Sequence, residues 1–195
     1  MYQILKRLFD IAASFLGIIV FSPLFLLLIF IIKITSPGSA FFRQKRIGKG
    51  KKYFDILKFR TMYKETPSEK PTHLLENPYN YITPIGRFLR RTSLDEIPQL
   101  FNIIIGDMSM VGPRPALWNQ TDLVAERDKF GVNDLRPGLT GLAQIKGRDE
   151  LPINVKASYD GEYVKKMSLL FDLRIIFLTI IAVIKGEGVK EGRRY

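Results

Sequence analysis

The segment RRTSLDEIPQLFN, which runs from Arg90 to Asn102, places two adjacent carboxylates, Asp95 and Glu96, shortly after a pair of arginines. The whole chain has 195 residues, with 30 Lys and Arg against 19 Asp and Glu and a formal net charge of +11. Such an excess favours anionic partners, among them nucleic acid, anionic lipids and phosphorylated substrates. Neighbouring helical residues point about 100° apart, so the two carboxylates suit different tasks. One could attack phosphorus while the other holds a cation or positions a proton.

A structural role for the two carboxylates is the alternative. Ser93 followed by Glu96 fits a capping box, in which Ser93 begins a helix and Glu96 bonds back to the Ser93 backbone. Acidic residues in a first helical turn also interact favourably with the helix dipole. However, the free N–H groups of the same turn keep a carboxylate ionised and bind phosphate. The motif alone therefore leaves both a cap and a catalytic pair open.

Several basic residues stand on backbone that proline and glycine constrain, as in the Gly-Pro-Arg-Pro turn and the RPG…GR segment. Any one of them could be a solvated surface charge, but rigid loops that present several cations suit a phosphate clamp. The candidate phosphate or substrate ligands are Arg90, Arg114, Lys58, Arg60, Arg136 and Arg148.

The absence of cysteine excludes disulfides, Cys-ligated zinc and thiol catalysis. His73 is the single histidine and lies in a polar stretch, so we do not expect it to be functional. A metal in such a chain would be a hard cation held by carboxylates and phosphates, and Mg²⁺ fits that description best.

The stretch from Ile11 to Ile32 has 22 residues and no charge. As a helix it is long enough to cross a hydrocarbon layer of roughly 30 Å. Ser22 and Pro23 lie in its middle, where proline removes a backbone donor and predicts a kink. Basic residues flank both ends, which places both ends on the cytoplasmic side by the positive-inside rule. We therefore expect a re-entrant helix, with a plain spanning helix as the alternative.

A second apolar stretch, MSLLFDLRIIFLTIIAVIKGEG, lies near the C-terminus. Asp172 and Arg174 interrupt it, and the uninterrupted run from Ile175 to Ile184 is too short to span a bilayer. This pattern predicts a core helix or an interfacial helix in the headgroup plane.

The remaining sequence predicts one mainly α domain with minor β structure, an α+β fold seated on a membrane. We divide it into a re-entrant membrane helix at 1–35 and a cytoplasmic catalytic domain at 36–195. The expected elements are a strand in KYFDILKF, helices over Ile85–Leu89 and Asp95–Ile105, a short helix capped by Asn119 or Thr121 and ended by Gly131, and loops over Tyr63–Tyr81, GDMSMVGPRPALW and LRPGLTGLAQIKGRDELP.

The motifs KFRTM, RRTSLDEIPQLFNIIIGDMSMVGPRP and RPGLTGLAQIKGR, together with the KRLFD start and the Ser-Pro-broken helix, closely resemble the bacterial sugar transferase family. Its members are monotopic polyprenyl-phosphate phosphoglycosyl transferases, and the likeness covers nearly the whole chain. The resemblance implies transfer of a sugar-1-phosphate from a UDP-sugar to undecaprenyl phosphate, with release of UMP. It implies a role in starting capsule, O-antigen, exopolysaccharide or glycoprotein glycan assembly.

Carried over by motif position, the resemblance makes Asp95 the nucleophile and gives a phosphosugar-aspartyl intermediate. Glu96 would be its partner in binding Mg²⁺, and Arg90 and Arg114 would bind phosphate. Lys58 and the arginines of the RPG…GR segment would line the nucleotide-sugar site. Arg60 stands where some members carry lysine, which a phosphate contact should tolerate.

The same resemblance implies a monotopic protein on the cytoplasmic face of the bacterial inner membrane, in contact with anionic lipids. The segments GPRPALWNQ, KGRDE and GEGV are similar to those of small capsule-biosynthesis members that handle N-acetylated deoxy or diamino sugars. A homodimer is left open, and no nucleic-acid-binding motif is found. The rival functions are a membrane-bound glycosyl transferase that releases UDP and a non-catalytic basic scaffold.

Overall fold

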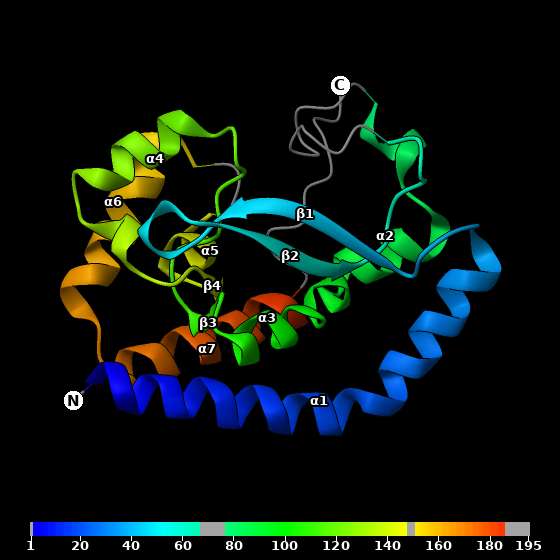
Figure 1. Cartoon of the computed structure of the whole chain (residues 1–195), viewed down its shortest axis with the longest axis horizontal. Helices are drawn as coiled ribbons and strands as arrows, with labels where there is room; N and C mark the ends of the chain where they lie inside the picture. The colour runs from blue at the N-terminus through cyan, green and yellow to red at the C-terminus, as the bar shows by residue number, and fades with distance from the viewer. Residues whose placement is uncertain (1, 67–76, 148–150, 186–195) are drawn as a thin grey trace.

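The computed structural model describes residues 2–66, 77–147 and 151–185, so His73 and Arg148 lie outside the described residues (Figure 1). The helices are α1 (Tyr2–Thr35), α2 (Pro84–Arg91), α3 (Gln99–Ile105), α4 (Thr121–Asp128), α5 (Leu142–Lys146), α6 (Ile153–Lys166) and α7 (Leu169–Ile184). The strands are β1 (Phe41–Ile47), β2 (Tyr53–Phe59), β3 (Ser109–Val111) and β4 (Gly138–Thr140). Short 3₁₀ turns are η1 (Lys49–Lys51), η3 (Pro78–Tyr81), η4 (Leu94–Glu96) and η5 (Val132–Asp134). The mainly helical α+β class is confirmed.

Helix α1 is bent, with one long arm beneath the rest of the molecule and a second arm that rises toward β1 (Figure 1). Pro23 lies inside the helix and cannot donate a hydrogen bond to the carbonyl of Ile19. The hydroxyl of Ser22 donates to that carbonyl instead, at 2.8 Å. The Ser-Pro pair thus satisfies the acceptor that the proline would leave open, and the bend agrees with the predicted kink.

The first arm of α1 is fixed to the globular part by polar contacts. Lys6 forms a buried ion pair with Asp172 of α7, with 2.8 Å between Nζ and Oδ2. The guanidinium of Arg7 donates to the carbonyls of Ile103 and Ile104 at the C-terminal end of α3. Asp10 accepts the Met110 N–H of β3 at 3.0 Å.

The second arm of α1 is held by apolar packing. Its residues Phe25, Leu28 and Ile32 are buried against Phe59 of β2 and Leu89 of α2. Both arms therefore contact the same globular body, although the apolar stretch from Ile11 to Ile32 runs through the bend that joins them.

Strands β1 and β2 form an antiparallel hairpin in which Phe41 pairs with Phe59 and Ile47 pairs with Tyr53. Gly50 in the connecting turn has φ of 63°, a left-handed conformation that glycine adopts at little cost. The strand predicted in KYFDILKF is confirmed as β2.

A second, parallel pair joins β3 and β4, where only loops were expected. Gly112 and Gly138 make this pairing possible, because a Cβ on either would overlap the backbone of the facing segment. The loop prediction was wrong here, since the two glycines mark a close approach of two backbone segments rather than two free turns.

The predicted helix over Ile85–Leu89 is confirmed as part of α2. The expected cap of α4 is wrong, because the N-cap position is Gln120. The Gln120 side chain accepts the N–H of Leu117 and thereby shapes the chain entering the helix.

Exposed apolar side chains gather on three helices. In α7, Ile175 is fully buried while the other side of the helix is open, so the segment is both a core helix and an exposed apolar one. Among the described residues, α1 alone is long and apolar enough to cross a membrane. These surfaces indicate membrane association. Their most exposed members are Ile4, Leu8, Phe15, Leu16, Val20, Leu26, Phe30 and Ile34 of α1, Ile105 of α3, and Leu170, Phe177 and Ile184 of α7.

Candidate active site

The adjacent carboxylates lie on η4, a single 3₁₀ turn between α2 and α3. The capping box, one of the two alternatives left open for Ser93, is not formed, because Ser93 has φ of 57° and its side chain makes no cap hydrogen bond. An N-cap needs extended backbone, whereas Ser93 ends the preceding turn by donating its N–H to the carbonyl of Arg90 at 3.1 Å. The predicted helix over Asp95–Ile105 is likewise divided into η4 and α3. The carboxylates are therefore not explained by capping.

Glu96 is the acceptor for two basic residues from separate elements. Its Oε1 lies 2.6 Å from Nζ of Lys58, at the end of β2. The same oxygen accepts hydrogen bonds from both terminal nitrogens of Arg114 at 3.3 Å. Lys58 and Glu96 are largely buried, so solvent screens this pair less than it would a surface pair.

Asp95 is only 8% exposed and sits among charged groups. The pKa of its carboxyl is raised to about 6, mainly because of burial and also because of the nearby Glu96, while Lys58, Arg90 and Arg114 oppose the rise. The group is thus mostly ionised at neutral pH yet poorly solvated. A carboxylate that is ionised but poorly solvated is suited to act as a nucleophile.

Helix α2 positions Arg90. Thr83 caps this helix by accepting the Gly86 N–H at 3.0 Å, and a Cβ at Gly86 would overlap the Thr61 backbone. The helix therefore packs directly on the segment that follows β2. There the Nε of Arg90 donates to the Thr61 hydroxyl at 2.8 Å, which fixes the direction of the guanidinium.

The loop that carries Arg114 is held by the β1–β2 hairpin. Arg46 of β1 donates to the carbonyl of Pro115 at 3.0 Å, and the N–H of Ile47 donates to the carbonyl of Ala116 at 2.9 Å. At the other side of the arginine, Gly112 donates to the carbonyl of Thr140 at 2.8 Å. Arg114 thus stands between two anchored backbone segments.

The other predicted basic ligands lie elsewhere. Arg60 is buried and donates to the carbonyls of Ser36 and Pro37, where the chain leaves α1. Arg136 donates from Nε to the carbonyl of Gly106 and is not among the charges that act on Asp95. The structure brings Lys58, Arg90 and Arg114 to the carboxylates, and it leaves Arg60 and Arg136 in other surroundings.

Sequence reasoning missed Asn102, which ties the site together. Its side chain accepts the Leu57 N–H and donates to the carbonyl of Asp55, both at 2.9 Å, and so fixes α3 to β2. An amide on an otherwise apolar helix face was the signal that could have identified it.

Comparison with known proteins agrees with these features. The sequence profile described as bacterial sugar transferase matches residues 1–186. The chain belongs to this family. Membership makes it an enzyme of the sugar phosphotransferase type.

Three relatives illustrate the family. The exopolysaccharide production protein ExoY of Rhizobium meliloti is 40% identical over 94% of this chain and 87% of its own length. The undecaprenyl-phosphate galactose phosphotransferase of Salmonella typhimurium is 36% identical over 95% of this chain and 42% of its own length. The UDP-glucose:undecaprenyl-phosphate glucose-1-phosphate transferase of Klebsiella pneumoniae is 39% identical over 91% and 40% respectively. The chain thus spans less than half the length of the last two relatives.

Proposed function

We propose that the protein transfers a sugar-1-phosphate from a UDP-sugar to undecaprenyl phosphate and releases UMP. The observation that carries the proposal is the buried carboxylate of Asp95, surrounded by Lys58, Arg90 and Arg114 from three separate elements. The names of the Salmonella and Klebsiella relatives, which both include undecaprenyl phosphate, support the acceptor, and the UDP-glucose in the name of the Klebsiella relative supports the donor class. The sugar is proposed to be an N-acetylated deoxy or diamino sugar, and the pathway to be assembly of a capsule or another surface glycan.

Two displacements at one phosphorus atom account for the reaction. An Asp95 oxygen bonds to the β-phosphorus, and the bond from that phosphorus to the bridging oxygen breaks, so UMP leaves with the bonding electrons. A phosphate oxygen of the lipid then attacks the same phosphorus. The bond to Asp95 breaks, which restores the carboxylate and yields the lipid diphosphate sugar. Each substrate thus reacts with the enzyme in turn, a ping-pong scheme.

The cations would stabilise the negative charge that develops on the phosphate oxygens in these steps. Arg90 and Arg114 present planar donors that match phosphate oxygens, and Lys58 supplies a point charge. Because Glu96 already holds Lys58 and Arg114, these two cations are in place before substrate arrives. Preformed cations stabilise developing phosphate charge without a reorganisation step.

The residues present fit a Mg²⁺ ion whose coordination would be completed by substrate phosphate and water. Asp95 and Glu96 are adjacent oxygen donors, and no group of three His, Cys, Asp or Glu that could hold a metal is found in residues 2–66, 77–147 and 151–185. Mg²⁺ commonly binds through one or two carboxylates with water and substrate phosphate. In this site it would neutralise charge on the diphosphate.

We further propose that α1 re-enters the cytoplasmic face of the inner membrane, so that residues 36–195 sit on that surface. The support is that Lys6 at one end and Ile32 at the other both contact the same globular body. A plain spanning helix would separate those contacts by the bilayer. Cysteines introduced at Gln3 and Ser39 test this by impermeant labelling of intact cells, since a re-entrant helix leaves both unlabelled and a spanning helix exposes one.

The deciding experiment measures nucleotide release with Mg²⁺, undecaprenyl phosphate and a panel of UDP-sugars. We expect UMP from the wild type and none from Asp95→Asn. Asp55→Asn is the matched control, because Asp55 is exposed on β2 and the same charge is removed away from the site. Release of UDP would instead indicate glycosyl transfer. Equal activity of Asp95→Asn and wild type would contradict the nucleophile, and inactivity of all variants across the panel would favour the scaffold.

A further inference from the structure

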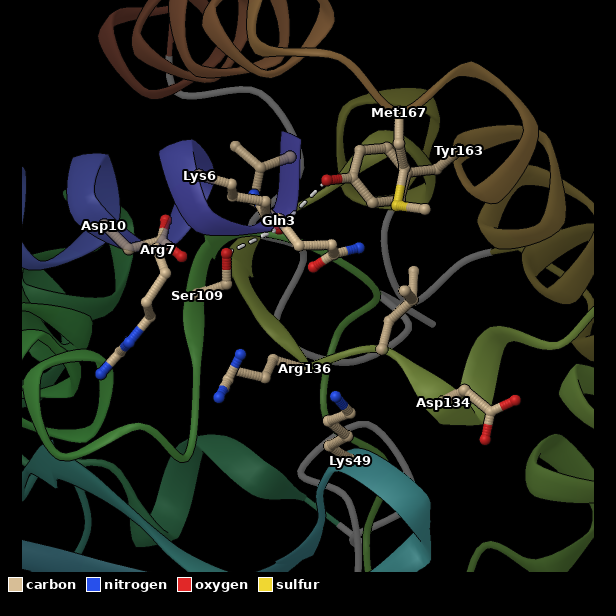
Figure 2. Close-up of a pocket in the computed structure, with 12 residues that line it drawn as sticks. Gln3, Lys6, Arg7, Asp10, Lys49, Ser109, Asp134, Arg136, Tyr163 and Met167 are labelled. Carbon is tan, nitrogen blue, oxygen red and sulfur yellow. Dashed lines mark hydrogen bonds between the residues drawn. The ribbon is translucent and has the colours of Figure 1, made fainter. Parts of the chain in front are cut away.

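A polar cavity of about 190 Å³ lies at the start of α1, away from the two carboxylates (Figure 2). Neither Asp95 nor any of the charged groups that act on it lines this cavity. Its walls come from the first turns of α1, from η1, from β3 and from the segment before β4. The cavity is therefore a separate feature from the candidate active site.

The cavity has a basic lining in which some groups are already engaged. Of its four cationic side chains, Lys6 is paired with Asp172 and Arg7 donates to two carbonyls of α3. The carboxylate of Asp10 accepts the Met110 N–H. These contacts build the wall and leave other polar groups to face the space.

Among the polar side chains that line the cavity, Gln3 of α1, Lys49 of η1 and Arg136 before β4 come from three different elements (Figure 2). Within the described part of the chain, Gln3 and Lys49 form no side-chain hydrogen bond or ion pair, and Arg136 uses only its Nε, toward the carbonyl of Gly106. The terminal guanidinium nitrogens, the ammonium group and the amide can therefore all donate to one ligand. Such a set of donors around a small space suits the oxygens of a phosphate group.

The surroundings place this cavity at the edge of the proposed membrane surface. On α1 the neighbouring side chains Ile4, Leu5 and Leu8 are apolar and exposed. Met167, which lines the cavity, lies between α6 and α7, and Leu170 in the first turn of α7 is exposed. A phosphate bound here would lie at the depth of lipid headgroups while remaining open to solution.

We propose that this cavity is a second phosphate-binding site, formed by Gln3, Lys49 and Arg136, for a phosphate group of a lipid or of a soluble anion. The proposal does not depend on the transfer reaction proposed above, because none of the groups that surround Asp95 takes part. It gives Arg136 a phosphate ligand away from the two carboxylates.

The test measures how fast Lys49 of the intact protein reacts with an amine-directed reagent, read by mass spectrometry. Lys52 is an internal control, since it is exposed on the same hairpin turn and does not line the cavity. Buried Lys6 reports that the fold is intact, because it should stay unlabelled. One arm adds inorganic phosphate to protein in non-ionic detergent, with chloride at equal ionic strength as the reference. The other arm compares vesicles of phosphatidylcholine with and without phosphatidylglycerol.

We expect the labelling rate of Lys49 to fall while that of Lys52 is unchanged. When phosphate is at twice its dissociation constant, a third of the sites are free, so the Lys49 rate should fall about threefold. Protection only by phosphatidylglycerol identifies the headgroup as the source, and protection by inorganic phosphate identifies a soluble anion. Gln3→Glu and Arg136→Gln should both abolish protection, and Gln3→Glu is compatible with a helix N-terminus. Equal protection of Lys49 and Lys52, no protection in either arm, or protection that survives both substitutions would overturn the proposal.

Discussion

Lys58 and Glu96, 38 residues apart in sequence, meet with 2.6 Å between Nζ and Oε1, while the neighbouring Asp95 is surrounded by the same cations. The two carboxylates of the motif thus have different surroundings. Glu96 holds the cations in position, and Asp95 is left buried with a raised pKa. This division agrees with separate tasks for the two residues.

The pKa of about 6 for Asp95 predicts an acid limb in the rate profile. Only the ionised carboxylate can attack phosphorus, so single-turnover UMP release should fall about tenfold per pH unit below about 6. The measurement is a pH series with a pre-bound donor. The pH range from 5 to 8 includes the pKa of about 6. A rate that does not change over this range would show that a group other than Asp95 is the nucleophile.

Substitution of Lys58 should affect both the rate and that profile. Lys58→Gln removes the largest of the influences that lower the pKa of Asp95, so the acid limb should move to higher pH. The rate at its optimum should fall about 100-fold, as for other preorganised charge-stabilising donors. Lys58→Arg should restore much of the pH profile. Lys52→Gln is the control, and a loss of rate with an unmoved acid limb would indicate a purely structural role for Lys58.

Asp95→Asn should stabilise the protein while it abolishes activity. The unfolded pKa is about 3.9, so between about pH 4 and 6 the native state keeps a proton that the unfolded state has lost. The contribution of Asp95 to the free energy of unfolding therefore falls as pH rises through this window. Above it the substitution should add on the order of 2–3 kcal/mol. Denaturant unfolding of both proteins at pH 4 and pH 7.5 measures this, and a gain of equal size at both pH values, which lie on either side of about 6, would contradict it.

Breaking the buried pair of Lys6 and Asp172 should detach the first arm of α1. Asp172 also accepts hydrogen bonds from Tyr2 and Tyr163, so Asp172→Leu leaves three donors without their acceptor. The expected loss in unfolding free energy is about 3–5 kcal/mol. Glu162→Leu is the control, since its pair with Lys166 is exposed and should contribute less than about 1 kcal/mol. If thermal unfolding shows the same loss of stability for Asp172→Leu and Glu162→Leu, the buried pair contributes no more to stability than the exposed one.

Straightening α1 should change how it sits in the membrane. Pro23→Ala supplies an N–H for the carbonyl of Ile19, which relieves the cause of the bend. A straight α1 could not keep both arms on the globular body, so we expect one of the cysteines at Gln3 and Ser39 to become accessible in intact cells. Ser22→Ala is the control, because it removes the substitute donor and retains the proline. If the labelling of Pro23→Ala is the same as that of the parent protein, Pro23 does not determine on which side of the membrane the two ends lie.

Local patterns predicted the elements that depend on local forces. The β2 strand and α2 follow from their own residue order, and a bend in α1 was expected from Pro23, which lies inside the helix. The motif could not decide the capping role of Ser93, because the N–H of Ser93 bonds back to the carbonyl of Arg90 at the end of α2. Likewise, the pairing of β3 with β4 depends on contact between distant glycines. For the basic residues, motif position could not distinguish Arg114, which meets Glu96, from Arg60, which is occupied by Ser36 and Pro37.

The packing of the second arm of α1 has a practical consequence for anyone who needs a water-soluble form. Phe59 and Leu89 are almost fully buried, and Phe25, Leu28 and Ile32 of α1 share their cluster. Deleting the N-terminal helix would open this cluster to water and yield an aggregating fragment rather than a soluble enzyme. Solubility would have to be engineered by replacing the outward-facing side chains of α1, with Leu8, Phe15 and Phe30 as the first candidates. The apolar surface of α1 and the candidate active site thus belong to one folding unit.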